Sequence, residues 1–129
     1  MWIGLVGSEM CIRDREEMDG EFLFKVYFPS DCLNPQGNVQ GGMITSVLDD
    51  CTALCVLFST KGKRFPNTTD FHTTFHRPLS LEPATIKASI LKIGKNIVSL
   101  EGKIFKEKDK LVASCLHTGF LFDTHGMKK

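Results

Sequence analysis

The sequence predicts an α+β fold in which a curved antiparallel sheet of five strands wraps around one long central helix. Three features of the chain predict this fold. One long segment has apolar residues at helical spacing on most of its sides. Short segments that alternate apolar and polar residues, as β-strands do, flank it on both sides. The chain shows no internal sequence repeat. The chain has 129 residues, of which 42% are hydrophobic, so we expect one core and one domain.

The central helix is predicted over residues 43–59, where apolar residues recur at helical spacing. The residues in this pattern are Ile44, Val47, Leu48, Cys51, Leu54, Cys55 and Phe58, with Val56 and Leu57 widening the apolar face. Gly62 then provides a stop signal, and Lys61, Lys63 and Arg64 place positive charge at the negative end of the helix dipole. The width of the apolar face indicates that the helix is buried on several sides.

Strand patterns lie on both sides of the helix. Residues 21–28 alternate apolar and polar side chains up to Pro29, and turn-forming pairs in residues 30–39 predict a loop. After the helix, strands are predicted over residues 68–76, 84–92, 97–106 and 111–122. Turn signals at residues 94–96 and 106–110 predict that the last three strands form an antiparallel meander.

A candidate site lies at the predicted start of the helix, where Gly41 and Gly42 precede Asp49 by about two turns. Glycines allow close approach to a ligand oxygen, and a helix N-terminus offers unpaired N–H groups and a positive dipole end. Asp49 lies about 12 Å along the axis from Gly41, on about the same face. If both act on one atom, the aspartate must therefore come from a neighbouring subunit.

This region resembles the hotdog-fold acyl-CoA thioesterases of the phenylacetate-pathway (PaaI-like) type. Their signature of Asn, Gly, His-Gly-Gly and Asp is matched by Asn34, Gly37, Gln40-Gly41-Gly42 and Asp49. The resemblance spans residues 21–123. It continues through Thr68-Thr69-Asp70-Phe71, Phe75-His76-Arg77-Pro78, Ile93-Gly94-Lys95 and Lys110-Leu111-Val112-Ala113. Gln40 departs from the family histidine, and it can form hydrogen bonds but cannot change charge near neutral pH.

The resemblance implies hydrolysis of an acyl-CoA thioester to a carboxylic acid and free CoA. The N–H groups of Gly41 and Gly42 would polarise the carbonyl, and Asp49 would act as nucleophile or as general base for water. Thr68 would position the water or the carboxylate, while Asn34 and Gln40 would orient the site. Taken singly, each residue except Asp49 has a simpler structural interpretation as a turn, strand or helix-start residue. The order and spacing of all these residues together favour a catalytic site over the separate structural interpretations.

The resemblance also implies a homodimer or homotetramer with active sites at the interface. The free edges of a single sheet with one helix agree with this expectation. Cations at Lys63, Arg64, Arg77 and Lys95, together with Lys61 and Lys92, are candidates for binding the phosphates of CoA. Lys95 is the strongest of them, because the family often has a basic residue after that hairpin glycine.

Two other functions remain open. A non-catalytic module that binds acyl-CoA or acyl carrier protein is favoured if the absence of a histidine at position 40 weakens catalysis. A hotdog dehydratase or hydratase is less favoured, because those enzymes usually need a catalytic histidine near the helix start. The acyl group is not specified, since Met43, Leu48, Phe58, Phe71 and Phe75 suit either an acyl tunnel or the core.

The composition narrows the class of protein. A net charge of +1 gives no indication of a nucleic-acid or membrane partner, and no apolar run is expected to approach the length that spans a membrane. Five cysteines at uneven spacings indicate reduced thiols in a cytoplasmic protein. The pairs His72/His76 and Cys51/Cys55 lack a recognised zinc spacing, and His117 and His125 lack a triad pattern. No metal and no cofactor beyond the CoA of the substrate are expected.

The first residues are expected to stand apart from the domain. The segment from Leu5 to Arg15 resembles a translated sequencing adapter, so residues 1–16 are interpreted as a non-native or disordered leader and residues 17–129 as the domain. If the segment is native, it is expected to cover the sheet.

Overall fold

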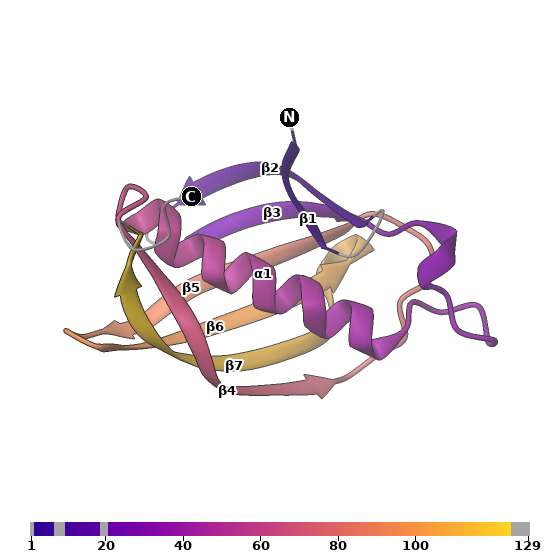
Figure 1. The fold of residues 1–129 in the computed structure, drawn as a ribbon. Coiled ribbons are helices and arrows are strands. Elements are labelled where there is room, and N and C mark those ends of the chain that lie inside the picture. The colour runs from indigo at the N-terminus through magenta and orange to yellow at the C-terminus, as the bar shows by residue number, and fades with distance from the viewer. Residues whose placement is uncertain (1, 7–9, 19–20, 125–129) are drawn as a thin grey trace.

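The computed structural model describes the backbone of residues 2–6, 10–18 and 21–124, and the side chains of residues 21–124. Its strands form one antiparallel sheet in the order β1-β2-β3-β5-β6-β7-β4 (Figure 1). The strands are β1 (Trp2–Val6), β2 (Met10–Met18), β3 (Glu21–Tyr27), β4 (Arg64–Phe75), β5 (Ala84–Ile93), β6 (Ile97–Lys106) and β7 (Lys110–Asp123). Strands β3 to β7 are the five predicted from the sequence, so the expected fold class is confirmed.

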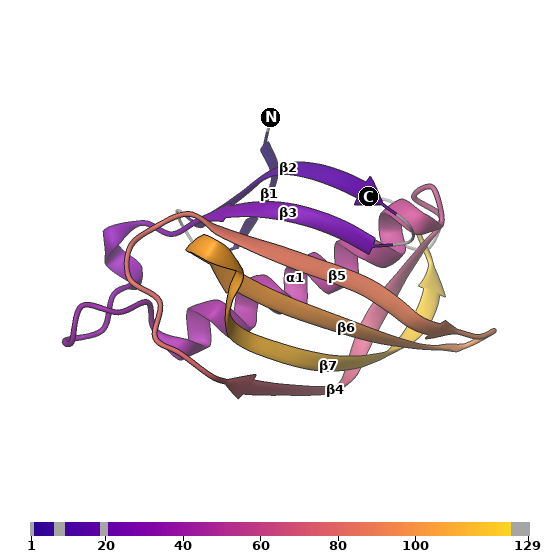
Figure 2. The same cartoon turned by 180° about the vertical axis from the view of Figure 1, so that it is seen from behind.

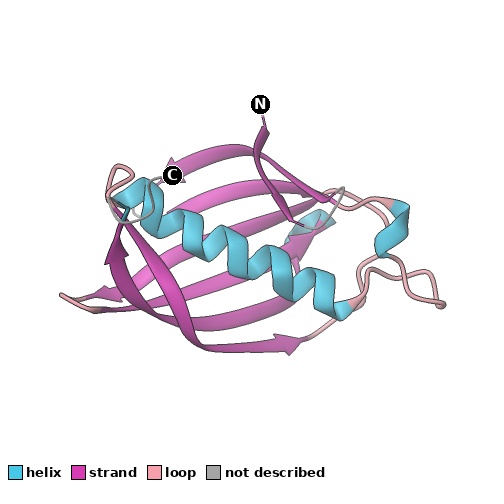
Figure 3. Cartoon of the chain, in the orientation of Figure 1, coloured by secondary structure: helices cyan, strands magenta, loops and turns pink. Residues whose placement is uncertain are grey.

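The helix α1 (Gly41–Ser59) lies along the concave side of the sheet (Figure 3). Seen from behind, β3, β5, β6 and β7 curve across the front of the view with the helix beyond them (Figure 2). The helix begins two residues earlier than predicted, because Gln40 already takes extended backbone angles as the N-cap. Two short 3₁₀ helices, Ser30–Cys32 and Glu107–Asp109, lie in the connections.

The core fills the space between α1 and the sheet. In β3, Phe22, Phe24 and Val26 are buried in alternation with more exposed residues, as the period of a strand requires. The core residues of α1 are Ile44, Val47, Leu48, Cys51, Ala53, Cys55 and Val56. Cysteines 32, 51, 55 and 115 are buried, which confirms their interpretation as small core residues.

Gly102 on β6 sets how closely α1 approaches the sheet. A Cβ atom at this position would lie 3.0 Å from Thr52 Cγ2, 3.1 Å from Cys115 Sγ and 3.4 Å from Leu48 Cδ2. The first two of these contacts are tighter than ordinary van der Waals packing. The glycine therefore allows the middle of the helix to lie directly against β6 and β7.

Strand β4 forms one edge of the sheet and pairs only with β7 among the described strands. It begins at Arg64, four residues before the predicted start, and it contains Pro66. Proline is tolerated in an edge strand because one side of that strand has no neighbour to receive an N–H hydrogen bond. The register shifts between Thr68 and Asp70, so the strand bends there.

The helix α1 has 19 residues and is long and apolar enough to cross a membrane by length and composition alone. The sequence-based expectation that no segment reaches this length is therefore wrong. Packing explains the composition, because the apolar residues of α1 that are buried belong to the core between helix and sheet. A buried core helix can have the same length and apolar composition as a membrane-spanning helix.

Strands β1 and β2 extend the sheet beyond β3, with β2 paired to β3 and β1 to β2. The N-terminal segment thus continues the sheet beside β3, whereas the alternative for a native segment expected it to cover the sheet. The assignment of residues 1–16 to a leader stays a prediction.

Candidate active site

Asp49 lies on α1 where the helix passes β4 and β7. Its side chain is 49% exposed, and its Oδ1 atom is 3.6 Å from Nε2 of His117 on β7. The side chain of His117 is fully buried. The carboxylate therefore has one side against the protein interior and the other open to a ligand.

His117 has a hydroxyl group at each ring nitrogen. Thr52 Oγ1 lies 2.7 Å from Nδ1, and Thr68 Oγ1 on β4 lies 2.8 Å from Nε2. The ring of Phe71 packs edge-on against the imidazole, with the two centroids 4.9 Å apart. Residues from α1, β4 and β7 thus hold this imidazole in one orientation.

Burial keeps this imidazole neutral near physiological pH. The pKa of His117 lies below its ordinary value because burial disfavours the charged ring, while the nearby charge of Asp49 partly opposes that effect. A neutral imidazole has one N–H donor and one bare acceptor nitrogen. His117 can therefore donate to one neighbouring hydroxyl and accept a hydrogen bond from the other.

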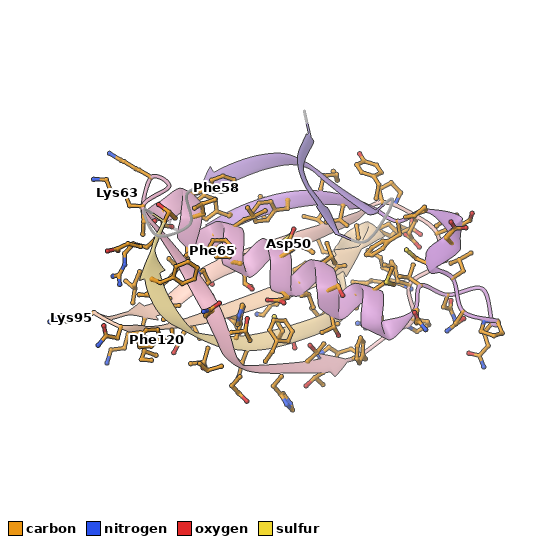
Figure 4. All side chains as sticks on the ribbon, viewed as in Figure 1. Asp50, Phe58, Lys63, Phe65, Lys95 and Phe120 are labelled. Carbon is orange, nitrogen blue, oxygen red and sulfur yellow. The ribbon has the colours of Figure 1, made fainter. Side chains whose placement is uncertain are left out.

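A cavity of about 370 Å³ opens beside this group of residues. It is lined by Ser46, Asp49, Asp50, Ala53, Phe65, Pro66, Asn67 and Thr68. Figure 4 shows Asp50 over the middle of α1 and Phe65 beside the first part of β4. Burial, followed by the charge of Asp49, raises the pKa of Asp50 to about 6. The cavity thus brings Asp49 and Thr68, two of the predicted site residues, to one surface.

Gly41 and Gly42 occupy the first two positions of α1, where N–H groups have no intrahelical acceptor. Gln40 is the N-cap, and its carbonyl accepts hydrogen bonds from the N–H groups of Met43 and Ile44. Its side chain makes no capping hydrogen bond. A Cβ atom on Gly41 would lie 3.2 Å from Cζ of Phe75, whereas one on Gly42 would meet nothing within 4 Å. The end of β4 therefore covers Gly41 on one side.

Asn34 stabilises the loop before the helix. Its Oδ1 accepts hydrogen bonds from the N–H groups of Gln36 and Asn38, at 2.9 and 3.1 Å. This is the turn-forming role that its position before Pro35 suggested. Asn34 in this loop, and Gln40, Gly41 and Gly42 at the start of α1, are not among the residues that line the cavity beside Asp49.

The candidate cations fall into two groups. Lys63, Arg64 and Lys95 lie at the end of the molecule where α1 terminates (Figure 4), and Arg64 Nη2 donates to the Lys95 carbonyl at 2.8 Å. Arg64 Nε also lies 3.6 Å from Asp123. Arg77 is elsewhere, with Nη1 donating to the Leu111 carbonyl at the start of β7. One chain therefore does not gather these four side chains around one ligand.

His117 is a member of the group of residues beside Asp49 that was not predicted from the sequence. It lies 65 residues from Thr52 and 49 from Thr68, so no local motif links them. A signal did exist, because His117 occupies an inward position of β7 between buried Cys115 and Gly119. No group of three or more His, Cys, Asp or Glu side chains in the described part of the chain could hold a metal ion.

The fold and the site together define a class of protein. A curved antiparallel sheet wrapped around one helix, with a half-exposed carboxylate on that helix, is the arrangement of hotdog-fold thioesterases. The family model described as Thioesterase superfamily matches residues 36–113, which is more than half of the chain. The chain belongs to the thioesterase superfamily. No curated protein matches it.

Solved structures share this fold. A phenylacetic acid degradation-related protein of Ralstonia eutropha JMP134 has a TM-score of 0.77 at 27% sequence identity, with 83% of each chain covered. A Streptococcus mutans UA159 protein bound to acetyl CoA has a TM-score of 0.77 at 17% identity, covering 92% of this chain and 93% of that one. A Streptococcus pneumoniae TIGR4 thioesterase protein with coenzyme A has a TM-score of 0.76 at 20% identity, with 85% of each covered.

Proposed function

We propose that the protein is an acyl-CoA thioesterase that hydrolyses its substrate to a carboxylic acid and free CoA. The observation that carries this proposal is the placement of Asp49 and Thr68 on one cavity, backed by buried His117. Membership of the thioesterase superfamily supports the reaction class. Two structural neighbours hold acetyl CoA and coenzyme A, and they support CoA as the carrier of the acyl group.

The proposed chemistry begins with the thioester carbonyl beside the N–H of Gly41. Negative charge grows on the carbonyl oxygen during attack, and one well-placed donor stabilises it by about 3 kcal/mol. Asp49 then acts in one of two ways. It removes a proton from an attacking water, or it attacks the carbonyl itself to form a mixed anhydride that water cleaves. In both routes the C–S bond breaks, and the CoA thiolate leaves and takes a proton.

The proposed site needs two subunits. Gly41 and Asp49 are eight residues apart on one helix, which separates them by about 12 Å along its axis. Gly41 of one protomer would therefore serve the carbonyl attacked with the help of a second protomer's Asp49. The free edge of β4 supports a homodimer, since an unpaired strand edge favours pairing with another chain.

A homotetramer is the larger assembly that we propose. Large apolar side chains on β5, β6 and β7 remain about half exposed, and a second pair of subunits would cover them. These residues are Leu91, Ile93, Ile97, Leu116 and Phe120. We place the enzyme in the cytoplasm, in agreement with the five cysteines at uneven spacings in its sequence, and assign it no cofactor beyond the CoA of its substrate.

Binding of CoA is assigned to Lys63, Arg64 and Lys95 at one end of a chain, and to Arg77 near the start of β7. Since one chain separates these groups, a site between subunits is the arrangement in which both can contact one nucleotide. Arg64 already donates a hydrogen bond to the Lys95 carbonyl, so the Lys63 and Lys95 ammonium groups would bind the phosphates.

A non-catalytic acyl-CoA or acyl-carrier binding module is the second candidate. Gln40 favours it, because the side chain at the N-cap of α1 has no charge to contribute. This candidate predicts tight binding of CoA esters without turnover.

Thiol release from a panel of acyl-CoA thioesters separates the two candidates. The parent protein is expected to release CoA, and Asp49→Asn is expected to lower kcat about a thousandfold or more with the oligomeric state unchanged. Asp31→Asn, an acidic residue in the 3₁₀ helix before α1, is the matched control and is expected to retain activity. Tight binding of CoA esters with no turnover of any acyl group would reject the enzyme.

A further inference from the structure

Thr52 lies behind the proposed active site, on the inner face of α1. It is fully buried, three residues beyond Asp49. Its hydroxyl oxygen is 2.9 Å from the carbonyl oxygen of Leu48, 3.1 Å from that of Asp49 and 2.7 Å from Nδ1 of His117. Three polar atoms therefore surround one hydroxyl that carries a single proton.

The chemistry of these atoms fixes the direction of the hydrogen bonds. A carbonyl oxygen can only accept, so the Thr52 hydroxyl donates to the helix carbonyls of Leu48 and Asp49, as buried threonines in helices commonly do. Its proton is then used, and it can only accept from His117. The proton of the neutral imidazole is therefore on Nδ1, and Nε2 is bare.

Because Nε2 of His117 carries no proton, it determines whether the Thr68 hydroxyl acts as a donor or an acceptor toward the cavity. Thr68 donates its hydroxyl proton to Nε2 across 2.8 Å, which leaves the lone pairs of Thr68 Oγ1 for a water molecule. In the other tautomer, an Nε2–H group would donate to Thr68 and would also face Asp49 Oδ1 at 3.6 Å. Such a donor stabilises the carboxylate and weakens it as a base or nucleophile.

We propose that Thr52 is a positioning residue that holds His117 as its Nδ1–H tautomer, so that Thr68 accepts from the water and no imidazole N–H faces the Asp49 carboxylate. This inference rests on the proposed thioesterase function and adds a residue that contacts no substrate. Gly102 makes the arrangement possible, because a side chain there would push against the methyl group of Thr52 at 3.0 Å.

The test is the tautomer of His117, read from ¹⁵N chemical shifts of its ring without substrate. The parent is expected to show Nδ1–H at neutral pH. Thr52→Val keeps the shape of the side chain but removes the hydroxyl, and it is expected to move the proton largely to Nε2. Thr52→Ser is expected to restore the parent signature. Thr60→Val is the matched control, since Thr60 makes the same contact to the carbonyl four residues earlier, at 2.9 Å, near the end of α1.

Kinetics supply the second readout. Thr52→Val is expected to lower kcat about ten- to a hundredfold with KM little changed, and Thr52→Ser is expected to recover most of that loss. An Nε2–H signature in the parent, or an unchanged tautomer in Thr52→Val, overturns the inference. A shifted tautomer with unchanged kcat also overturns it. If the parent shows the Nδ1–H tautomer but turns over no thioester, the proposed function has failed and the positioning role fails with it.

Discussion

Two regions of α1 differ in how many of the groups of the proposed site one chain places around them. The region around Asp49 has its supporting groups in place, since His117 and Thr68 come from β7 and β4 of the same protomer. The region around Gly41 and Gly42 offers N–H groups at the helix start, with no carboxylate of the same helix in reach. In the proposed mechanism, this difference means that folding of one chain prepares the base, Asp49, whereas the carbonyl-binding half of the site is completed only when two subunits assemble.

Of the changes that distinguish the two regions, removal of the Gly41 N–H is expected to lower kcat the most. Gly41→Pro removes this donor at the first helical position, where proline is well tolerated, and Gln40 already has the extended backbone that precedes proline. We expect kcat to fall about a hundred- to a thousandfold. Thiol-release kinetics measure the change.

Gly41→Ala is the control for that variant, because it adds the same contact with Phe75 at 3.2 Å but keeps the N–H. Gly41→Ala is expected to retain most of the activity. Equal losses in the two variants would mean that crowding against Phe75, rather than the missing donor, is the cause.

A smaller effect is expected on the Asp49 side from Thr68→Val, which removes the hydroxyl that faces both His117 and the cavity. We expect kcat to fall about tenfold to a hundredfold, less than for loss of Asp49 itself. Thr69→Val is the neighbouring control, since Thr69 Oγ1 donates to the Thr118 carbonyl. Equal activity in Thr68→Val and the parent would remove Thr68 from the site.

Asp50 is expected to affect stability in a pH-dependent way. Its pKa of about 6 in the folded protein exceeds the ordinary value of 3.8, so the folded state binds the proton more tightly and loses stability as pH rises from about 4 to 6. Asp50→Asn should therefore raise Tm by about 3 °C at pH 7.5.

The gain from Asp50→Asn should largely vanish near pH 3, below the ordinary pKa of 3.8, where the parent carboxyl is mainly protonated in both states. Thermal unfolding of parent and variant at both pH values measures it. The titration of His117 cancels in this comparison, because both proteins contain it. A gain of equal size at both pH values would show that ionisation of Asp50 is not its source.

The smallest effect is expected at the cationic end of the chain. Lys95→Ala should raise KM for acyl-CoA a few-fold with kcat unchanged, because exposed ion pairs contribute little and salt screens them. The effect should shrink at high ionic strength. Lys108→Ala, in the turn between β6 and β7, is the control. A KM that does not respond to Lys95→Ala at low salt would remove this residue from the CoA site.

Most of the fold could be predicted from the sequence, because local periodicity determines α1 and strands β3, β5, β6 and β7. The start of β4 could not, since Pro66 and Asn67 suggest a turn and only the position of the strand at a sheet edge makes proline acceptable. Asp49 and Thr68 were predicted from their order along the chain. His117 and Thr52 were not predicted, because they are far apart in the sequence and only the folded structure brings them into contact.

Mixing two inactive variants tests the central claim most directly. Asp49→Asn and Gly41→Pro are each expected to be nearly inactive alone, but a mixed dimer has one site in which both groups are intact. Subunit exchange at equal amounts should restore about a quarter of parent activity, since half of the dimers are mixed and each has one working site. Activity no higher than the sum of the two variants, with mixed dimers verified by mass spectrometry, would contradict a site shared between subunits.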